Sequence, residues 1–263
     1  MNGLTVIVTG ASSGIGRALA LAWAARGADL VLSARDAVAL EDVAQAVRSR
    51  GGRAFVHSGD ITVEGDRTSL IEAARLSTGR LDVLVNCAGQ GYYGSVALID
   101  PQELASLFAL NVVAPLRLAQ LAIDPLTRTS GCVVMLSSVA GVVASPRMGA
   151  YAASKFALEA LSMSLRAELG AAGIRVLVVR PGPVDTAFRA HAVTTDGRAG
   201  VRPRAARVQS PEEVAEQTVV AVERGQAVVE TTSFVRLASA AARWTPGVVR
   251  WVTAAMATRR ADP

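Results

Sequence analysis

The chain has 263 residues, of which 51% are hydrophobic and 19% are charged, so it can bury a large core and is not a disordered chain. Only 4% are aromatic, which disfavours stacking platforms for single-stranded nucleic acid. Residues 1–179 carry 15 basic and 14 acidic side chains, whereas residues 180–263 carry 12 and 8, so most of the net charge of +5 lies in the last third. We therefore expect no nucleic-acid partner. The chain has 26 arginines and one lysine, Lys155, and only lysine offers a compact charge whose pKa shifts readily.

The two cysteines, Cys87 and Cys132, lie in apolar runs and form neither a disulfide framework nor a zinc spacing. We expect them to be buried, and we expect no metal site. The chain begins directly with the apolar run Leu4–Val8, without a basic segment or a cleavage site. No uninterrupted apolar run reaches the roughly 18 residues that a membrane span needs. A cytoplasmic protein is expected.

Strand-like and helix-like segments alternate through the first 180 residues. Runs of Val, Leu and Ile predict strands at Leu4–Thr9, Leu30–Ser33, Ala54–His57, Leu81–Asn86, Cys132–Ser137 and Ile174–Arg180. Apolar residues at helical spacing predict helices at Ile15–Arg26, Val38–Arg50, Ser69–Ser77, Pro101–Leu110, Val112–Leu126 and Tyr151–Ala171. This order predicts an α/β, doubly wound parallel sheet of about seven strands with helices on both faces.

The alternation of strand-like and helix-like segments stops after Arg180, where Pro181-Gly182-Pro183 ends the strand. A capping box at Ser210-Pro211-Glu212-Glu213 predicts a further helix, and Ala227–Glu230 a last strand. No internal repeat or low-complexity linker is present, so we assign residues 1–232 to one domain and residues 233–263 to a helical C-terminal extension.

Arginines and tryptophans recur at intervals of seven residues in the C-terminal extension. Arg236, Arg243 and Arg250 form one series, and Trp244 and Trp251 form another. Pro246-Gly247 interrupts the pattern, which predicts two short amphipathic helices. Three alternatives stay open: the extension roofs a substrate pocket or packs on the domain, joins a subunit interface, or lies on a membrane surface.

A glycine-rich loop, Thr9–Gly16, follows the first strand and opens the first helix. Gly10 permits a tight turn, Gly14 lets the backbone approach a pyrophosphate, and Gly16 lets the helix pack closely on the strand. The helix N-terminus presents amide donors to the phosphate. We therefore predict a dinucleotide site, to which Ser12, Ser13 and Ile15 also contribute.

The end of the second strand bears on the choice of cofactor. An acid at this place accepts a hydrogen bond from the ribose hydroxyl of NAD, but Ala34 stands there and Arg35 follows. A guanidinium can pair with the 2′-phosphate of NADP. Asp36 is either a ribose acid or the N-cap of the next helix. The residues favour NADP(H), with NAD(H) as the alternative.

Tyr151 and Lys155 are four residues apart, so they lie one turn apart on one helical face. A positive charge near a phenol favours the phenolate and lowers its pKa, which makes the tyrosine a usable acid or base nearer neutral pH. The one lysine of the chain thus occurs where its ammonium can lower the pKa of a tyrosine.

With these motifs the chain resembles the short-chain dehydrogenase/reductase family, a group with the Rossmann-like fold. The resemblance spans about residues 3–232 and covers Thr9–Gly16, Asp60-Ile61 (an adenine contact), Asn86-Cys87-Ala88-Gly89, Asn111, Ser138, Tyr151, Lys155 and the segment Pro181-Gly182-Pro183-Val184-Asp185-Thr186. Cys87 stands where the family has a second asparagine. Ser138 lies thirteen residues before Tyr151, the family spacing for the catalytic serine; its neighbour Ser137 is the weaker candidate.

The resemblance implies hydride transfer between a nicotinamide and a carbonyl or alcohol carbon. Tyr151 would be the acid or base, Ser138 would orient the oxygen, Lys155 would hold the ribose and lower the pKa of Tyr151, and Asn111 would position a water. Asn86, Ala88, Gly89, Pro181, Gly182, Val184 and Thr186 would contact the cofactor. It also implies a homodimer or homotetramer formed through the helices at 111–126 and 151–171.

The likeness is greatest to the hydroxysteroid and retinol dehydrogenase branch and related bacterial reductases, which implies a small apolar ketone, aldehyde or alcohol as substrate. Tyr92 and Tyr93 either line the substrate pocket or anchor a loop. Four arginines, Arg198, Arg202, Arg204 and Arg207, fall in the family's substrate lid at about 186–210. They are either a solvated lid or receive the anionic part of a 3-ketoacyl thioester. A non-catalytic cofactor-binding sensor or scaffold is the alternative of another class, but it would tolerate loss of the tyrosine and lysine that this chain keeps.

Overall fold

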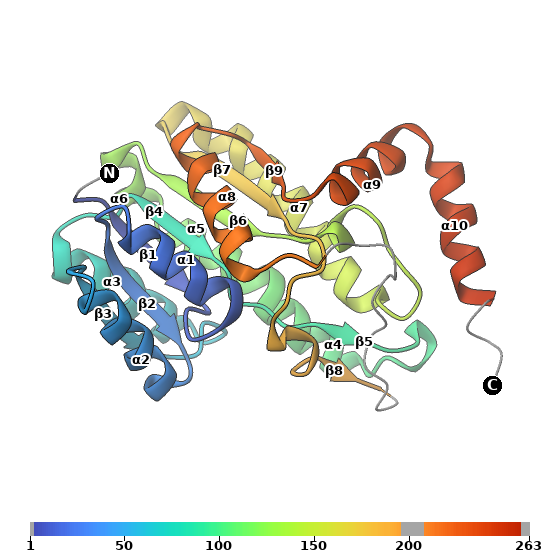
Figure 1. The fold of residues 1–263 in the computed structure, drawn as a ribbon, viewed down its shortest axis with the longest axis horizontal. Helices are drawn as coiled ribbons and strands as arrows, with labels where there is room; N and C mark the ends of the chain where they lie inside the picture. Colours follow the sequence, from blue (N-terminus) through green and yellow to red (C-terminus); the bar gives the residue numbers. More distant parts are fainter. Residues whose placement is uncertain (1–2, 196–207, 259–263) are drawn as a thin grey trace.

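Seven parallel strands form one continuous sheet in the order β3-β2-β1-β4-β6-β7-β9 (Figure 1). The structure is a computed structural model that describes residues 3–195 and 208–258. The strands are β1 (Thr5–Thr9), β2 (Asp29–Ala34), β3 (Ala54–Ser58), β4 (Val83–Asn86), β6 (Cys132–Leu136), β7 (Arg175–Arg180) and β9 (Val228–Glu230). The predicted doubly wound α/β fold is therefore confirmed.

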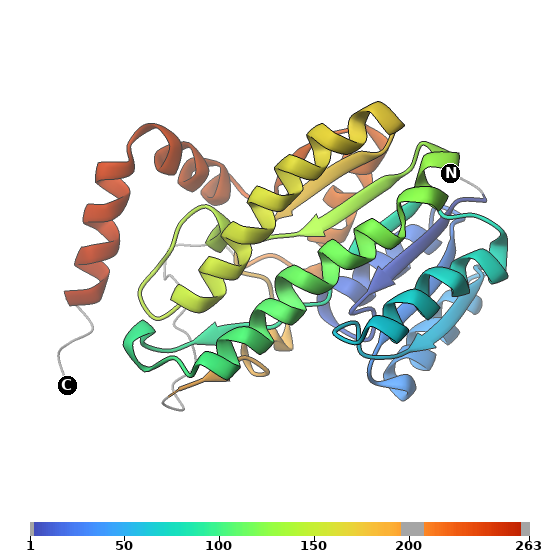
Figure 2. The same cartoon turned by 180° about the vertical axis from the view of Figure 1, so that it is seen from behind.

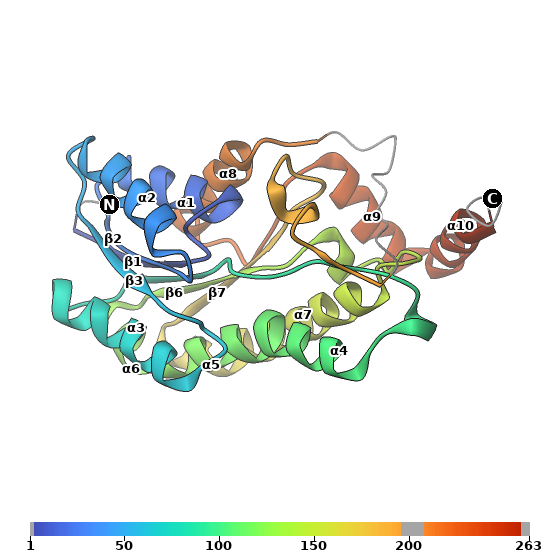
Figure 3. The same ribbon diagram turned by 90° about the horizontal axis from the view of Figure 1, so that it is seen from below.

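Helices cover both faces of the sheet (Figure 3). One face carries α1 (Gly14–Ala24), α2 (Ala37–Arg48) and α8 (Pro211–Glu223), and the other carries α3 (Glu64–Thr78), α5 (Ala114–Leu121), α6 (Ile123–Thr129) and α7 (Gly149–Leu169). Successive strand residues face opposite sides. Val6 and Val8 of β1 thus enter the first core with Trp23, and Ile7 enters the second with Leu118.

The strand order reverses direction at β1, and ligands of open α/β sheets bind at such a point. β1 pairs with β2 on one side and with β4 on the other, so the chain turns in opposite directions from this point. The loops that leave β1 and β4 meet here. A Cβ on Gly10 would lie 2.9 Å from the Cα of Ala88, so only a glycine permits this approach. Gly10 also has a φ of +66°, a conformation that glycine adopts without strain.

The helical region 101–129 differs from the prediction. Instead of helices at 101–110 and 112–126, the chain forms α4 (Pro101–Phe108), a π-helical turn (Ala109–Val113), α5 and α6. Pro115 has no N–H and cannot donate to the carbonyl of Asn111 four residues earlier, which disfavours a regular α-helix at this point. The run Pro101–Leu121 is long and apolar enough to cross a membrane by composition. However, its Ala114, Leu118 and Ala119 are fully buried, so we assign it to the core.

A second, two-stranded sheet was not predicted. It pairs β5 (Tyr92–Tyr93) with β8 (Val193–Thr194) in parallel register. The two segments are a hundred residues apart and each is only two residues long, so neither has a strand pattern of its own. Their pairing holds the segment after β7 against the loop after β4.

The C-terminal extension forms two helices, α9 (Ser233–Trp244) and α10 (Pro246–Thr258), separated at the predicted proline. Val235 of α9 is fully buried and fastens the start of the extension to the domain. Beyond this point the extension leaves the body, and α10 projects outward (Figure 1). Figure 2 shows α5 and α7 side by side on the far face.

Candidate active site

The catalytic candidates gather at the carboxyl end of β6. Ser138 follows this strand, and Tyr151 and Lys155 lie in the first two turns of α7. Tyr151 and Lys155 are 7% and 5% exposed, although both are polar. Such burial of ionisable groups in a fold is typical of functional sites. The structure thus brings together three residues that the sequence separates by up to 17 positions.

The Tyr151 phenol is held in an apolar environment. Its ring lies 5.7 Å from that of Phe188, and it belongs to a cluster with Ala140 and Ala150. Burial raises the pKa of Tyr151, and the hydrogen bond with Ser138 acts in the opposite direction. The expected lowering of this pKa by Lys155 does not dominate. Nζ of Lys155 lies 5.8 Å from the ring centroid, and the loss of hydration is the largest effect on this pKa. The phenol is therefore protonated at neutral pH.

The Lys155 ammonium is fixed at the end of β6. Its Nζ donates a 2.8 Å hydrogen bond to the carbonyl oxygen of Leu136. Burial lowers the pKa of Lys155 to about 8, while the charge of Glu159, one turn further along α7, acts to raise it. This ammonium has two further protons to donate, which suits a contact with a ribose.

Asn111 lies in the π-helical turn and is 1% exposed. Its Oδ1 accepts a hydrogen bond from the N–H of Gln90 (2.9 Å), and its Nδ2 donates to the carbonyl of Gln90 (2.9 Å) and to Oγ of Ser154 (3.1 Å). A Cβ on Gly89 would lie 3.2 Å from this Oδ1 and 3.6 Å from Nζ of Lys155. Gly89 thus keeps open the space that Asn111 and Lys155 share.

The structure separates the two serines that follow β6. Ser138 is within hydrogen-bonding reach of Tyr151, and its Oγ accepts from the N–H of Ala140 (3.1 Å), which fixes its orientation. Ser137 is 5% exposed, its Oγ has no hydrogen-bond partner, and it lies close against Gly141. This geometry favours Ser138 as the group that would contact a substrate oxygen.

The loop after β1 has the shape that a pyrophosphate requires. A Cβ on Gly16 would overlap the carbonyl oxygen of Gly10, so α1 approaches β1 as closely as a helix can. Ser13 precedes α1 but its side chain makes no capping hydrogen bond, so no side chain competes for the first amides of the helix. These amides and the glycine surface fit the phosphates of a dinucleotide. Ser12, Ser13 and Ile15 are all at least partly exposed on this loop.

Thr9 supports this site in a way that the sequence did not indicate. Its hydroxyl accepts hydrogen bonds from the N–H groups of Cys87 (3.0 Å) and Ala88 (3.1 Å) and donates to the carbonyl of Val85 (3.2 Å). One side chain therefore ties the loop after β4 to the end of β1. Cys87 itself is half-buried, and burial raises its pKa to about 12, so it stays a neutral thiol.

The adenine end of the predicted site lies at the ends of β2 and β3. Asp36 caps α2, since its Oδ1 accepts from the N–H of Ala39 (3.0 Å). Arg35 is exposed, and its charge helps to lower the pKa of Asp60, after the larger effect of the hydrogen bond from the N–H of Thr62. Arg35 and Asp60 thus face the same region, beside the largely buried Ile61.

The segment after β7 returns over the glycine loop. A Cβ on Gly14 would lie 3.1 Å from Cγ2 of Thr186, which places Thr186 against the start of α1. Pro181 is buried, Gly182 and Val184 are partly exposed, and Asn86 and Ala88 stand at the end of β4. Of the cofactor contacts implied by the resemblance, Thr186 thus lies directly against the glycine loop.

Tyr92 and Tyr93 have different surroundings. Tyr92 is 1% exposed, and its hydroxyl donates to Glu103 of α4 (2.8 Å), which is the geometry of an anchor. Tyr93 is buried near Tyr151 and raises its pKa slightly further. Phe188 was not singled out from the sequence, and its ring contact with Tyr151 could have been suspected only from its place two residues after Thr186. The predicted lid arginines Arg198, Arg202, Arg204 and Arg207 lie outside the described residues.

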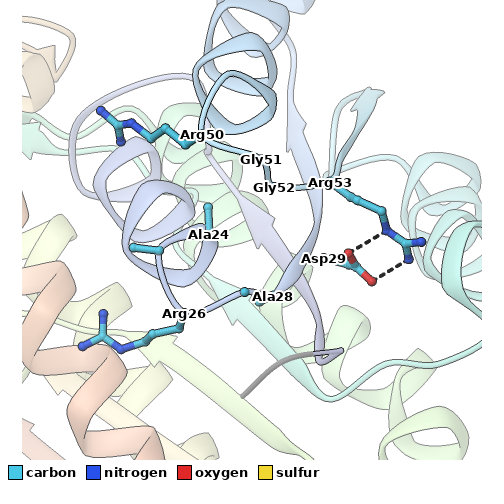
Figure 4. Close-up of a pocket in the computed structure, with 10 residues that line it drawn as sticks. Ala24, Arg26, Ala28, Asp29, Arg50, Gly51, Gly52 and Arg53 are labelled. Carbon is cyan, nitrogen blue, oxygen red and sulfur yellow. Dashed lines mark hydrogen bonds and ion pairs between the residues drawn. The ribbon is translucent and has the colours of Figure 1, made fainter.

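A surface hollow of about 390 Å³ lies far from these groups (Figure 4). Arg50, Gly51, Gly52 and the start of β2 line it, at the amino ends of the strands. Arg53 and Asp29 form a two-pronged ion pair there (2.7 and 2.5 Å). Because ligands of open α/β sheets bind at the carboxyl ends of the strands, we do not connect this hollow with the catalytic residues.

Comparisons with known proteins show the family of the chain. The sequence profile of the short chain dehydrogenases matches residues 4–197. Dehydrogenase/reductase SDR family member 7B of Mus musculus is 35% identical over 239 residues, which are 88% of this chain and 73% of that protein. Glycine betaine reductase ATRR of Emericella nidulans is 35% identical over 232 residues, but the chain spans only 18% of its length.

Solved structures are similar over nearly the whole chain. A short-chain dehydrogenase from Sphingobium yanoikuyae in complex with NADPH superposes with a TM-score of 0.77 at 30% identity, covering 99% of this chain and 98% of that one. One from Streptomyces avermitilis gives a TM-score of 0.81 at 28% identity, covering 99% and 98%. The chain therefore belongs to the short-chain dehydrogenase/reductase family and is an oxidoreductase that acts on alcohol or carbonyl groups with NAD(P).

Proposed function

We propose that the enzyme is an NADP(H)-dependent reductase or dehydrogenase of small apolar ketones, aldehydes or alcohols. The observation that carries the proposal is the placement of the Tyr151 side chain beside Ser138 and against Phe188 in an apolar cluster. A charged or strongly polar substrate would lose hydration against these side chains without gaining a partner among them.

The residues have distinct tasks in the reduction. Ser138 Oγ donates a hydrogen bond to the carbonyl oxygen and orients it, and Tyr151 Oη gives its proton to this oxygen as the alcohol forms. The nicotinamide, when bound, supplies the hydride to the carbonyl carbon or accepts it in the reverse direction. The glycine loop, Lys155 and Thr186 would hold this cofactor. The Asn111 side chain positions Gln90 by hydrogen bonds to its N–H and its carbonyl oxygen.

We infer the preference for NADP(H) from the different contacts of Arg35 and Asp36. The Asp36 carboxylate caps α2 through its Oδ1, and Arg35 is an exposed cation at the end of β2. A guanidinium pairs well with a phosphate, whereas a ribose hydroxyl gains little from it.

We also propose that two copies associate through α5 and α7. Three large apolar side chains are exposed there: Val113, directly before α5, at 47%, and Phe156 and Met163 of α7 at 43% and 67%. Adjacent exposed apolar residues on neighbouring helices are typical of a subunit interface. Met163→Glu should shift the protein toward the monomer in light scattering after size exclusion, whereas Leu76→Glu, an equally exposed position on α3, should not.

A substrate panel tests the proposed activity. Ketones, aldehydes, steroids, retinoids and 3-ketoacyl thioesters are offered with NADPH, and consumption is followed by absorbance, with NADH as the cofactor control and Tyr151→Phe as the blank. We expect turnover of the apolar carbonyl compounds with NADPH. Turnover of thioesters alone, or a preference for NADH, would overturn the proposal.

A further inference from the structure

The C-terminal helices expose large apolar side chains along one face. Phe234, Leu237 and Trp244 of α9 are 39%, 72% and 75% exposed. They are spaced by three and seven residues and so share a face. Val248, Trp251 and Val252 of α10 are 57%, 73% and 42% exposed, and their spacing of three and four residues from Val248 also places them on one face. Burial of Val235 on a different side of α9 fastens the helix to the domain without covering this face.

The charged side chains of the extension are arginines, apart from Asp262 next to the last residue. Residues 231–261 contain five arginines and no acidic residue. Arg236 and Arg243 lie together on one flank of the apolar face of α9, and the guanidinium of Arg243 lies 5.3 Å above the Trp244 ring. The two helices combine an apolar face that includes exposed tryptophans with arginines as their only charged residues. This combination is typical of helices that lie on an anionic bilayer surface.

We propose that α9 and α10 form a membrane-surface element that docks the enzyme on bilayers containing anionic phospholipid. Each helix has 12 or 13 residues. At 1.5 Å per residue this is about 20 Å, which is shorter than the roughly 30 Å of the hydrocarbon core. The helices therefore lie in the interface and do not span it. Trp244 and Trp251 enter the headgroup region, and the arginines contact lipid phosphates.

A second copy of the chain fits this face less well. A two-fold interface places the same patch on both partners, so it would bring two sets of arginines together with no acid on α9 or α10 to pair with them. The exposed residues of α5 and α7 offer a separate surface for self-association. The membrane proposal is independent of the substrate of the enzyme, because it uses none of the residues of the active site.

Vesicle binding of the full-length protein tests the proposal. The protein is sedimented with vesicles of phosphatidylcholine alone or of phosphatidylcholine with phosphatidylglycerol, and its tryptophan emission is recorded. Trp23 is fully buried, so a blue shift on binding reports on Trp244 and Trp251. We expect sedimentation and a blue shift with the anionic vesicles, both weakened by salt.

Variants separate the contributions of the two kinds of side chain. Trp244→Ser with Trp251→Ser should lower the partition coefficient by about tenfold or more, and Arg236→Gln with Arg243→Gln should reduce the preference for anionic lipid. Leu76→Ser, which removes an exposed apolar residue from α3, should bind as the wild type does. All of these positions are exposed, so thermal unfolding should stay unchanged.

Two results would overturn the proposal. One is failure of the wild type to sediment with the anionic vesicles at low salt. The other is a change of oligomeric state in the double tryptophan variant without a change in vesicle binding, which would assign this face to a second copy of the chain.

Discussion

Nζ of Lys155 lies 2.8 Å from the carbonyl oxygen of Leu136, the residue two positions before Ser138. This bond joins the first turns of α7 to the end of β6. It therefore fixes the distance between the helix that carries Tyr151 and the strand that delivers Ser138. The position needs a donor that reaches a carbonyl from within a buried space, and lysine fits where the wide guanidinium of arginine would not.

Replacement of Tyr151 by phenylalanine should remove the proton donor while keeping the ring contact with Phe188. We expect kcat to fall by about 10²–10⁴-fold and the affinity for NADPH to stay within a few-fold, measured by steady-state kinetics and cofactor fluorescence titration. Tyr92→Phe, which breaks the bond to Glu103, is the matched control and should affect stability more than kcat. Near-normal turnover by Tyr151→Phe would show that another group donates the proton.

The lowered pKa of Lys155 predicts a pH dependence of stability. Below about pH 8 the folded and the unfolded chain both carry the proton, and burial of the charge costs free energy. Between about pH 8 and 10.5 only the unfolded chain carries it, so the contribution of this group to stability rises with pH. The shift corresponds to about 3 kcal/mol at most.

Lys155→Met isolates this effect. The free energy of unfolding from urea titrations of the cofactor-free protein should rise for the wild type relative to Lys155→Met as pH increases from 8 to 10. Parallel curves for the two proteins would mean that Lys155 keeps an ordinary pKa in the fold.

Arg35 and Asp36 are neighbours with separable functions. Arg35→Ala should weaken NADPH binding by about tenfold or more, since a charge-assisted hydrogen bond contributes about 1.5–3 kcal/mol, and it should leave NADH binding unchanged. Asp36→Ala should lose the cap of α2 and about 1 kcal/mol of stability without altering the ratio of the two affinities. A selective loss of NADH affinity in Asp36→Ala would instead identify this acid as a ribose ligand.

Thr9→Val preserves shape but removes a hydroxyl that serves three backbone groups. Each N–H left unpaired inside the protein costs about 1–3 kcal/mol, so we expect the free energy of unfolding to fall by at least about 2 kcal/mol and cofactor affinity to fall with it. Thr9→Ser keeps the hydroxyl and should lose about 1 kcal/mol through its missing methyl group. Equal losses in both variants, measured by urea unfolding, would assign the effect to packing.

The sequence by itself determined the features that depend on local patterns. The alternation of apolar runs predicted a parallel sheet covered on both faces, and the spacing within Thr9–Gly16 predicted a glycine loop at the start of α1. The separation of Tyr151 and Lys155 placed both on one helical face. Each of these follows from the period of a strand or helix, or from the steric freedom of glycine, and so needs no knowledge of distant contacts.

The tertiary structure decided what depends on burial and on distant partners. It raised the pKa of Tyr151, where the lysine spacing had suggested a lowering, because burial among apolar groups removes the hydration that a phenolate needs. It also assigned Asp36 to the cap of α2 and gave Thr9 three backbone partners. It also left the tryptophans of the extension exposed. The seven-residue spacing of the sequence is compatible both with this exposure and with packing of the tryptophans on the domain. Hydration and packing are properties of neighbours in space, and the chain order alone does not specify them.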